Sequence, residues 1–170
     1  MSGFADFLIN HHVPQIVTST EQPKGEDMFE NNITTDVYNG SAWEGSLLVV
    51  SKLAGATGTA TVTCESCSAA DGSDNTAVAY RCRYSTTPDT FTAWADVTSS
   101  GQTITAGADD VWEFAIAHSD GYKGTATAPV NYQYFRWVLT EVADDPVDGS
   151  VVCMLVGPKH GHEIPGTVLT

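Results

Sequence analysis

The sequence predicts an all-β domain, an antiparallel sandwich or barrel, and three observations support this fold class. Runs rich in Val, Thr, Tyr, Phe and Trp recur along the chain, and turn-forming residues separate many of them at intervals of roughly eight to twelve residues. The body of the chain carries no sustained helical period with capping residues. At 170 residues, the chain has the length of one domain with one hydrophobic core.

Seven runs give the main predicted strands, and a short additional strand is expected at Gln102–Thr105. The seven runs are Ser46–Lys52, Thr57–Glu65, Ala77–Ser85, Phe91–Val97, Val111–Ala117, Tyr132–Val142 and Ser150–Val156. Segments rich in Asp, Gly, Ser and Pro lie between many of these runs, as expected of turns, because these residues adopt turn conformations readily.

The alternation of side chains along a strand predicts which face each strand buries. Two strands collect their large apolar residues on one parity, which indicates a core face: Trp112, Phe114, Ile116, Phe135, Trp137 and Leu139. The run Ser150–Val156 is apolar on both parities, which predicts a central strand covered on both faces. The segment Thr57–Val62 alternates threonine with small residues, which favours an outer or edge position.

The charge of the chain argues against nucleic-acid binding. The net charge is −14, with 21 acidic and 7 basic residues, whereas affinity for phosphates comes from Lys and Arg. We therefore expect a protein partner that is neutral or basic where it meets the acidic loops.

No apolar run in the sequence is long enough to cross a membrane as a helix. The longest apolar run, Val151–Val156, is far shorter than the roughly 20 residues that span a bilayer. The N-terminus lacks the basic and apolar start of a secretory signal, so we expect no membrane association.

The four cysteines are expected to be reduced and structural. Cys64 and Cys67 form a CxxC motif, but a structural zinc site needs a second pair and a redox site needs a βαβ setting, and the sequence offers neither. A metal or redox role for this motif remains the less favoured alternative. Cys82 and Cys153 lie inside β-rich runs, where free cysteine behaves as a small buried hydrophobe.

Catalytic and metal-binding motifs are largely missing from the sequence. It contains no Gly-x-Ser-x-Gly elbow, no phosphate-binding glycine loop and no HExxH, and a Ser–His–Asp set would need His118 or a chain end to fold into a cleft. His160 and His162 could hold a metal where several copies meet on a symmetry axis, but an exposed tail is the favoured interpretation. The acidic loops fit turn chemistry better than calcium binding. We therefore expect no enzyme activity and no cofactor.

The two ends of the chain do not follow the strand pattern. The sequence predicts an N-terminal arm over residues 1–40, a β-sandwich over 41–157 and a C-terminal tail over 158–170. The first arm carries a cluster of apolar residues: Phe4, Phe7, Leu8 and Ile9. These side chains are candidates either to cover the domain's own core or to contact a neighbouring subunit.

The order of segments in the body of the chain resembles a known class of proteins. The segments, in order, are Ala56–Val62, Ala77–Tyr84, Phe91–Thr98, Thr103–Ala108, Tyr134–Val142 and Pro146–Val152. This succession resembles small virion structural proteins of tailed bacteriophages, which are often encoded beside the major capsid protein. The resemblance covers about two-thirds of the chain and leaves out both ends, the histidine pairs and the CxxC motif.

The resemblance implies a head decoration or cement protein with a jelly-roll-like β-sandwich. Such a protein sits on the capsid exterior, binds the major capsid protein and often itself as a dimer or trimer, and is assembled in the bacterial cytoplasm. A tail, neck or baseplate component of the same kind of particle is one alternative. A carbohydrate-binding module is another, with Trp43 and Trp94 as the candidate stacking residues, because Trp112 and Trp137 fall on core-facing parities.

Overall fold

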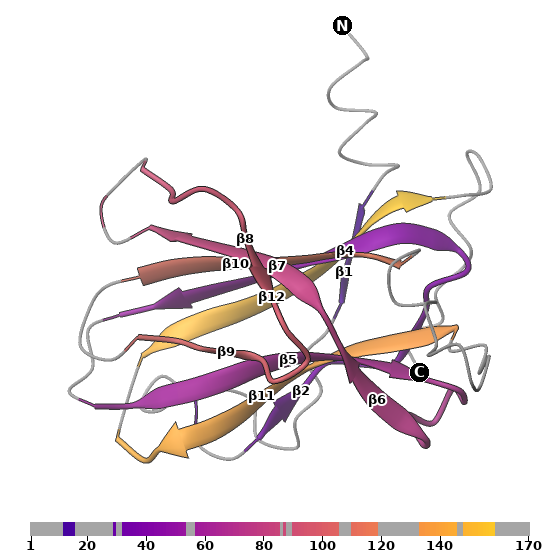
Figure 1. The fold of residues 1–170 in the computed structure, drawn as a ribbon, viewed down its shortest axis with the longest axis horizontal. Coiled ribbons are helices and arrows are strands. Elements are labelled where there is room, and N and C mark those ends of the chain that lie inside the picture. Colours follow the sequence, from indigo (N-terminus) through magenta and orange to yellow (C-terminus); the bar gives the residue numbers. More distant parts are fainter. Residues whose placement is uncertain are drawn as a thin grey trace, which may run out of the picture.

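The computed structural model describes residues 12–15, 29, 32–53, 57–85, 87, 90–105, 110–118, 133–145 and 148–158. These residues form two antiparallel β-sheets that pack face to face as a sandwich (Figure 1), which confirms the predicted fold class. Within these ranges the chain forms no helix of the length and apolar character that crossing a bilayer requires.

Early strands pair with late strands, in nested order. Sheet A has the order β1 (His12–Gln15), β12 (Gly149–Pro158), β4 (Trp43–Lys52), β10 (Asp110–Ala117), β7 (Tyr80–Ser85) and β8 (Ala95–Val97). Sheet B has the order β2 (Ile33–Thr34), β11 (Tyr134–Ala143), β5 (Thr59–Cys67) and β6 (Asn75–Val78), with β3 (Tyr38–Asn39) beside β11 and β9 (Gln102–Thr103) beside β5. Thus β1 pairs with β12, β2 and β3 with β11, β4 with β10, and β5 with β6. This nesting is that of a jelly roll.

The core lies between the two sheets and contains the residues expected there. The six large residues predicted to face the core are all at most 5% exposed: Trp112, Phe114, Ile116, Phe135, Trp137 and Leu139. Trp137 Nε1 donates a hydrogen bond to Ser46 Oγ at 3.0 Å, and the Tyr38 hydroxyl lies 2.6 Å from the same oxygen. These bonds satisfy polar atoms that burial would otherwise leave unpaired.

The predicted strand Ala77–Ser85 is two strands in different sheets. The chain passes at Ala79 from β6 in sheet B to β7 in sheet A, and Figure 1 shows this ribbon crossing between the layers. Tyr80 helps to fix the crossing, because its hydroxyl reaches sheet B and donates to the carbonyl oxygen of Val62. The run contains neither Gly nor Pro, so no local signal marks the change of sheet.

Two further expectations differ from the structure. The predicted strand Phe91–Val97 is a strand only at Ala95–Val97, because Phe91 and Trp94 pack instead against the guanidinium of Arg83. The Thr57–Val62 pattern does not mark an edge: β5 lies between β11 and the pair β6 and β9, and its threonines face outward.

The sandwich includes residues that precede the predicted boundary at residue 41. Strand β1 pairs with β12, with His12 opposite Val156, and the side chains of Phe29, Ile33 and Tyr38 lie in the core. These partners are distant in sequence, so a local pattern cannot show them. The predicted contact residues Phe4, Phe7, Leu8 and Ile9 lie outside the described residues, as does residue 159 onward in the predicted tail.

Candidate docking surface

The outer face of sheet A is apolar along β12 and β4, two adjacent strands inside the sheet. Strands β12 and β4 are apolar on both parities, and the inward parity fills the core with residues such as Leu48 and Leu155. The outward parity contributes five apolar side chains, which we call the apolar face: Leu47, Val49, Val152, Met154 and Val156. The prediction that Ser150–Val156 is covered on both faces is therefore wrong for the outer face, where Val152 is 42% and Val156 is 37% exposed.

The strand register makes the apolar face continuous. Val152 lies opposite Val49, and Met154 lies opposite Leu47, so two apolar pairs stand side by side on adjacent strands. Cross-strand neighbours on one face lie about 5 Å apart, close enough for their side chains to touch. Contiguous apolar surface of this kind marks a contact site more often than single exposed hydrophobic residues do.

An aromatic and charged cluster borders the apolar face at β7. The Arg83 guanidinium lies 4.6 Å from the ring centre of Phe91 and 4.7 Å from that of Trp94, and Arg83 Nε donates to Glu113 Oε2 at 2.5 Å. Glu113 is the cross-strand neighbour of Val49, so the register places the cluster next to the apolar pairs. Trp94 remains 40% exposed. Tryptophan and arginine are the residue types that most often carry binding energy at protein interfaces.

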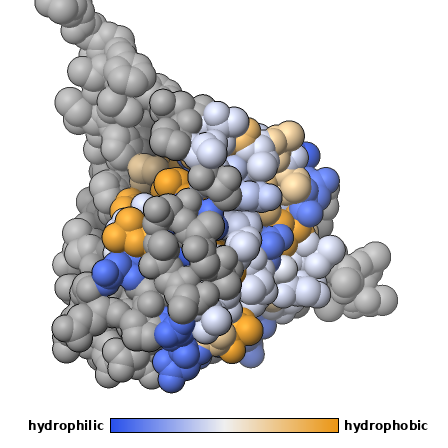
Figure 2. All heavy atoms as spheres, turned by 90° about the vertical axis from the view of Figure 1, so that its left-hand side faces the viewer, coloured by the Kyte–Doolittle hydropathy of each residue, from blue (hydrophilic) through white to orange (hydrophobic). Residues whose placement is uncertain are grey.

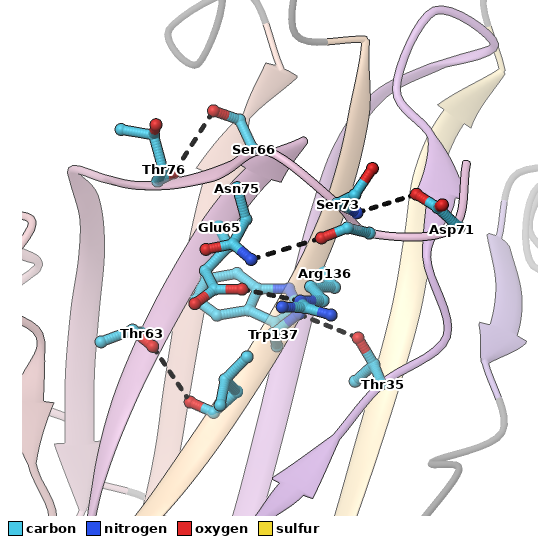
Figure 3. A network of polar contacts seen from close by, with 12 residues as sticks. Thr35, Thr63, Glu65, Ser66, Asp71, Ser73, Asn75, Thr76, Arg136 and Trp137 are labelled. Atoms are coloured by element: carbon cyan, nitrogen blue, oxygen red, sulfur yellow. Dashed lines mark hydrogen bonds and ion pairs between the residues drawn. The ribbon is translucent and has the colours of Figure 1, made fainter. Parts of the chain in front are cut away.

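The outer face of sheet B is polar, in contrast to that of sheet A. Thr61 and Thr103 join β5 to β9 through their hydroxyls at 2.8 Å, and Arg136 Nε donates to Glu65 Oε2 at 2.6 Å. Figure 3 shows this ion pair beside the turn that carries Asp71. Exposed apolar groups such as Val142 occur singly here. The two faces of the sandwich therefore differ in kind: among the described residues, only the outer face of sheet A presents an apolar pair of strands.

The end of the sandwich is a weaker candidate for docking. Figure 2 looks at the end that lies on the left of Figure 1, and among its coloured residues hydrophobic groups are scattered between polar ones. No broad hydrophobic area stands out among those residues. The apolar face of sheet A is thus the best-supported contact surface on the described part of the chain.

The charge around these surfaces is negative. Each arginine that the structure describes is already bound to a carboxylate: Arg81 to Asp96, Arg83 to Glu113 and Arg136 to Glu65. Exposed carboxylates such as Glu44 and Asp148 have no ion-pair partner among the described residues. A complementary partner would therefore be apolar at its centre and basic at its margin.

The CxxC motif does not form a chelating pair. Cys64 and Cys67 both lie in β5, where residues three apart point to opposite faces of the strand. All four cysteines are free and buried. Burial raises the pKa of the Cys153 thiol to about 12, and burial, together with the nearby Cys153 and Cys67, holds the pKa of Cys64 well above its usual value. Such thiols stay protonated and are poor nucleophiles.

The remaining candidates for chemistry are buried or lie outside the described residues. His118 is fully buried, with Nδ1 2.8 Å from the carbonyl oxygen of Trp43 and its ring stacked on Phe135 at 4.6 Å. His160 and His162 fall outside the described residues. The described part of the chain contains no group of three or more His, Cys, Asp or Glu side chains that could hold a metal ion.

The sugar-stacking candidates are not brought together. Trp43 is only 3% exposed, so its faces are not open to a ligand. Trp94 is exposed, but one face of its ring is occupied by Arg83.

The sequence patterns predicted neither the cluster that Arg83 forms with Phe91 and Trp94 nor the apolar face of sheet A. A usable signal existed in the doubly apolar runs of β4 and β12, although Ser150–Val156 in β12 was interpreted as covered on both faces.

Comparison of the chain with protein-family models, with curated proteins and with solved structures finds no match.

Proposed function

We propose that this protein is a non-enzymatic structural component of a tailed-bacteriophage particle that decorates the outside of the head and bridges neighbouring capsid subunits. The observation that carries the proposal is the apolar face of sheet A, with Val152 and Val156 exposed on the same parity of β12, on either side of Met154. The resemblance of the segment order to small virion proteins supplies the type of particle. The major capsid protein is the proposed partner, and each copy would bind with the apolar face toward it.

The rigidity and the charge of this chain are compatible with such a role. A sandwich with a core that joins both sheets is a rigid body, so little conformational entropy is lost when it binds. Each copy buries a modest area, and repetition on a symmetric shell, with self-association into a dimer or trimer, turns weak contacts into strong overall attachment. The negative charge of the exterior disfavours capture of DNA during assembly in the bacterial cytoplasm.

The copy number of the protein in purified particles tests the proposal. A head decoration protein is expected in amounts comparable to the major capsid protein, because it occupies repeated sites over the whole shell. Quantitative mass spectrometry of intact particles measures this ratio. A ratio far below that of the capsid protein, together with location at the tail, would instead support the neck or baseplate alternative. Absence from particles would exclude both roles.

A further inference from the structure

Sheet A has a hollow of about 750 Å³ at one end of the apolar face. The sheet opens there because β7 stays paired with β10 only as far as Arg81 opposite Ala115 and then turns at Ala79 toward sheet B. Strand β4 continues beside β10 to Ala117 opposite Gly45. The hollow lies where β10 has no neighbour on this side among the described residues, and residues from β4, β7 and β10 line it.

Small residues, two carboxylates and Arg81 line the hollow, together with the larger Tyr80 and Ile116. Gly45, Ala115 and Ala117 line it with side chains no larger than a methyl group, so a long side chain can enter. Two carboxylates also line it, those of Glu44 and Asp96. Asp96 already accepts a hydrogen bond from Arg81 at 2.9 Å, whereas Glu44 is exposed and has no ion pair among the described residues. Among the described residues, the hollow therefore carries one carboxylate, that of Glu44, without an ion-pair partner.

The hollow is continuous with the apolar face. Met154 lies opposite Leu47, Leu47 lies opposite Ala115, and Ala115 lies opposite Arg81. A partner that covers the apolar face along this row reaches the hollow directly. A long basic side chain fits both properties of the site, because its aliphatic stem can lie on the alanines while its cation meets the carboxylate.

The net charge of the chain disfavours a second copy as the occupant. It would bring another net charge of −14 against the same acidic margin, and each arginine in the described ranges is already held by a carboxylate. Charge complementarity instead favours a different protein with a free lysine or arginine.

We infer that the hollow beside Glu44 is a subsite for a basic side chain of the protein partner, inserted while the apolar face is covered. The inference rests on the proposed function for the identity of that partner, but the subsite can be tested without it.

The test uses the full-length protein and two isosteric probes, N-acetyl-arginine amide and N-acetyl-citrulline amide, which differ in charge. When the arginine probe is titrated into the protein, NMR is expected to show saturable chemical-shift changes at Ala115 and Ala117. The neutral citrulline probe is expected to bind at least about fivefold more weakly, the scale of one charge contact. The substitution Glu44→Gln should remove that preference, and the matched control Glu141→Gln on sheet B should keep it.

Two results would overturn the inference: equal binding of the two probes, or an unchanged arginine preference in Glu44→Gln. The variant Ala117→Trp gives a second readout, because it fills the hollow at an exposed position and should abolish the shifts at Ala115. If the hollow does not prefer the arginine probe, attachment of the protein to particles through the apolar face is still expected. Failure of the proposed function would appear separately, as absence of the protein from particles.

Discussion

Replacing Trp137 with alanine is expected to lower the free energy of unfolding by about 3–5 kcal/mol, the range for truncating a large aromatic residue in a core. Trp137 is fully buried between the sheets, with the ring of Tyr80 packed edge-on at 5.2 Å. The change also removes the donor to Ser46 Oγ. A cavity therefore opens where the two sheets meet, and a buried oxygen loses one of its partners.

Chemical denaturation of matched variants measures this effect. Trp94→Ala is the control, because it deletes the same atoms from a side chain that is 40% exposed, and its expected cost is about 1 kcal/mol from the lost contact with Arg83. Should Trp137→Ala fail to fold, Trp137→Phe keeps most of the ring and is expected to cost about 1–3 kcal/mol, chiefly for the missing hydrogen bond. Equal losses at positions 94 and 137 would contradict the assignment of Trp137 to the centre of the core.

Raising the pH above about 9 is expected to destabilise the protein, because its buried thiols resist ionisation only in the folded state. Burial raises the pKa of Cys153 to about 12 and that of Cys64 well above its usual value. The unfolded thiol loses its proton near pH 8.5, so from there upward the unfolded state binds fewer protons than the folded state. The free energy of unfolding then falls by about 1.4 kcal/mol per pH unit for each such thiol, until the folded pKa is reached.

The slope of stability against pH isolates this contribution. Urea denaturation between about pH 8 and 11 should show a steep decline in the wild type and a shallower one in Cys153→Ala. The comparison uses the slope alone, so any loss of packing in the variant does not affect it. An identical slope in both proteins would show that the Cys153 thiol is not protected by burial.

Local sequence patterns were sufficient where a strand buries one parity of large side chains. Strand β10 and strand β11 were predicted almost to their ends, because alternation of aromatic and polar residues has one simple explanation in a half-buried strand. The division of Ala77–Ser85 between two sheets was not predictable. It depends on Tyr80 reaching the carbonyl of Val62 across the core, which is a tertiary contact.

The candidate site was the least predictable part of the molecule. Doubly apolar strands such as β12 have the same pattern whether the second face is covered by the domain itself or by a partner. Only the three-dimensional arrangement shows whether the domain itself covers that face, and it leaves Val152 and Val156 exposed. Likewise, Phe91 and Trp94 carry a β-like pattern, but their contact with Arg83 on β7 draws them out of the strand.

The proposed role of the apolar face can be measured by adding the purified protein to phage particles that lack it. The decisive pair of variants is Val152→Lys on the apolar face and Thr140→Lys on the outer face of sheet B. Both positions are exposed and both changes add one positive charge, so fold and net charge remain matched. We predict that Val152→Lys binds particles at least about tenfold more weakly than wild type, which corresponds to about 1.4 kcal/mol, while Thr140→Lys binds normally. Wild-type attachment by Val152→Lys, or loss of attachment by Thr140→Lys alone, would contradict docking through sheet A.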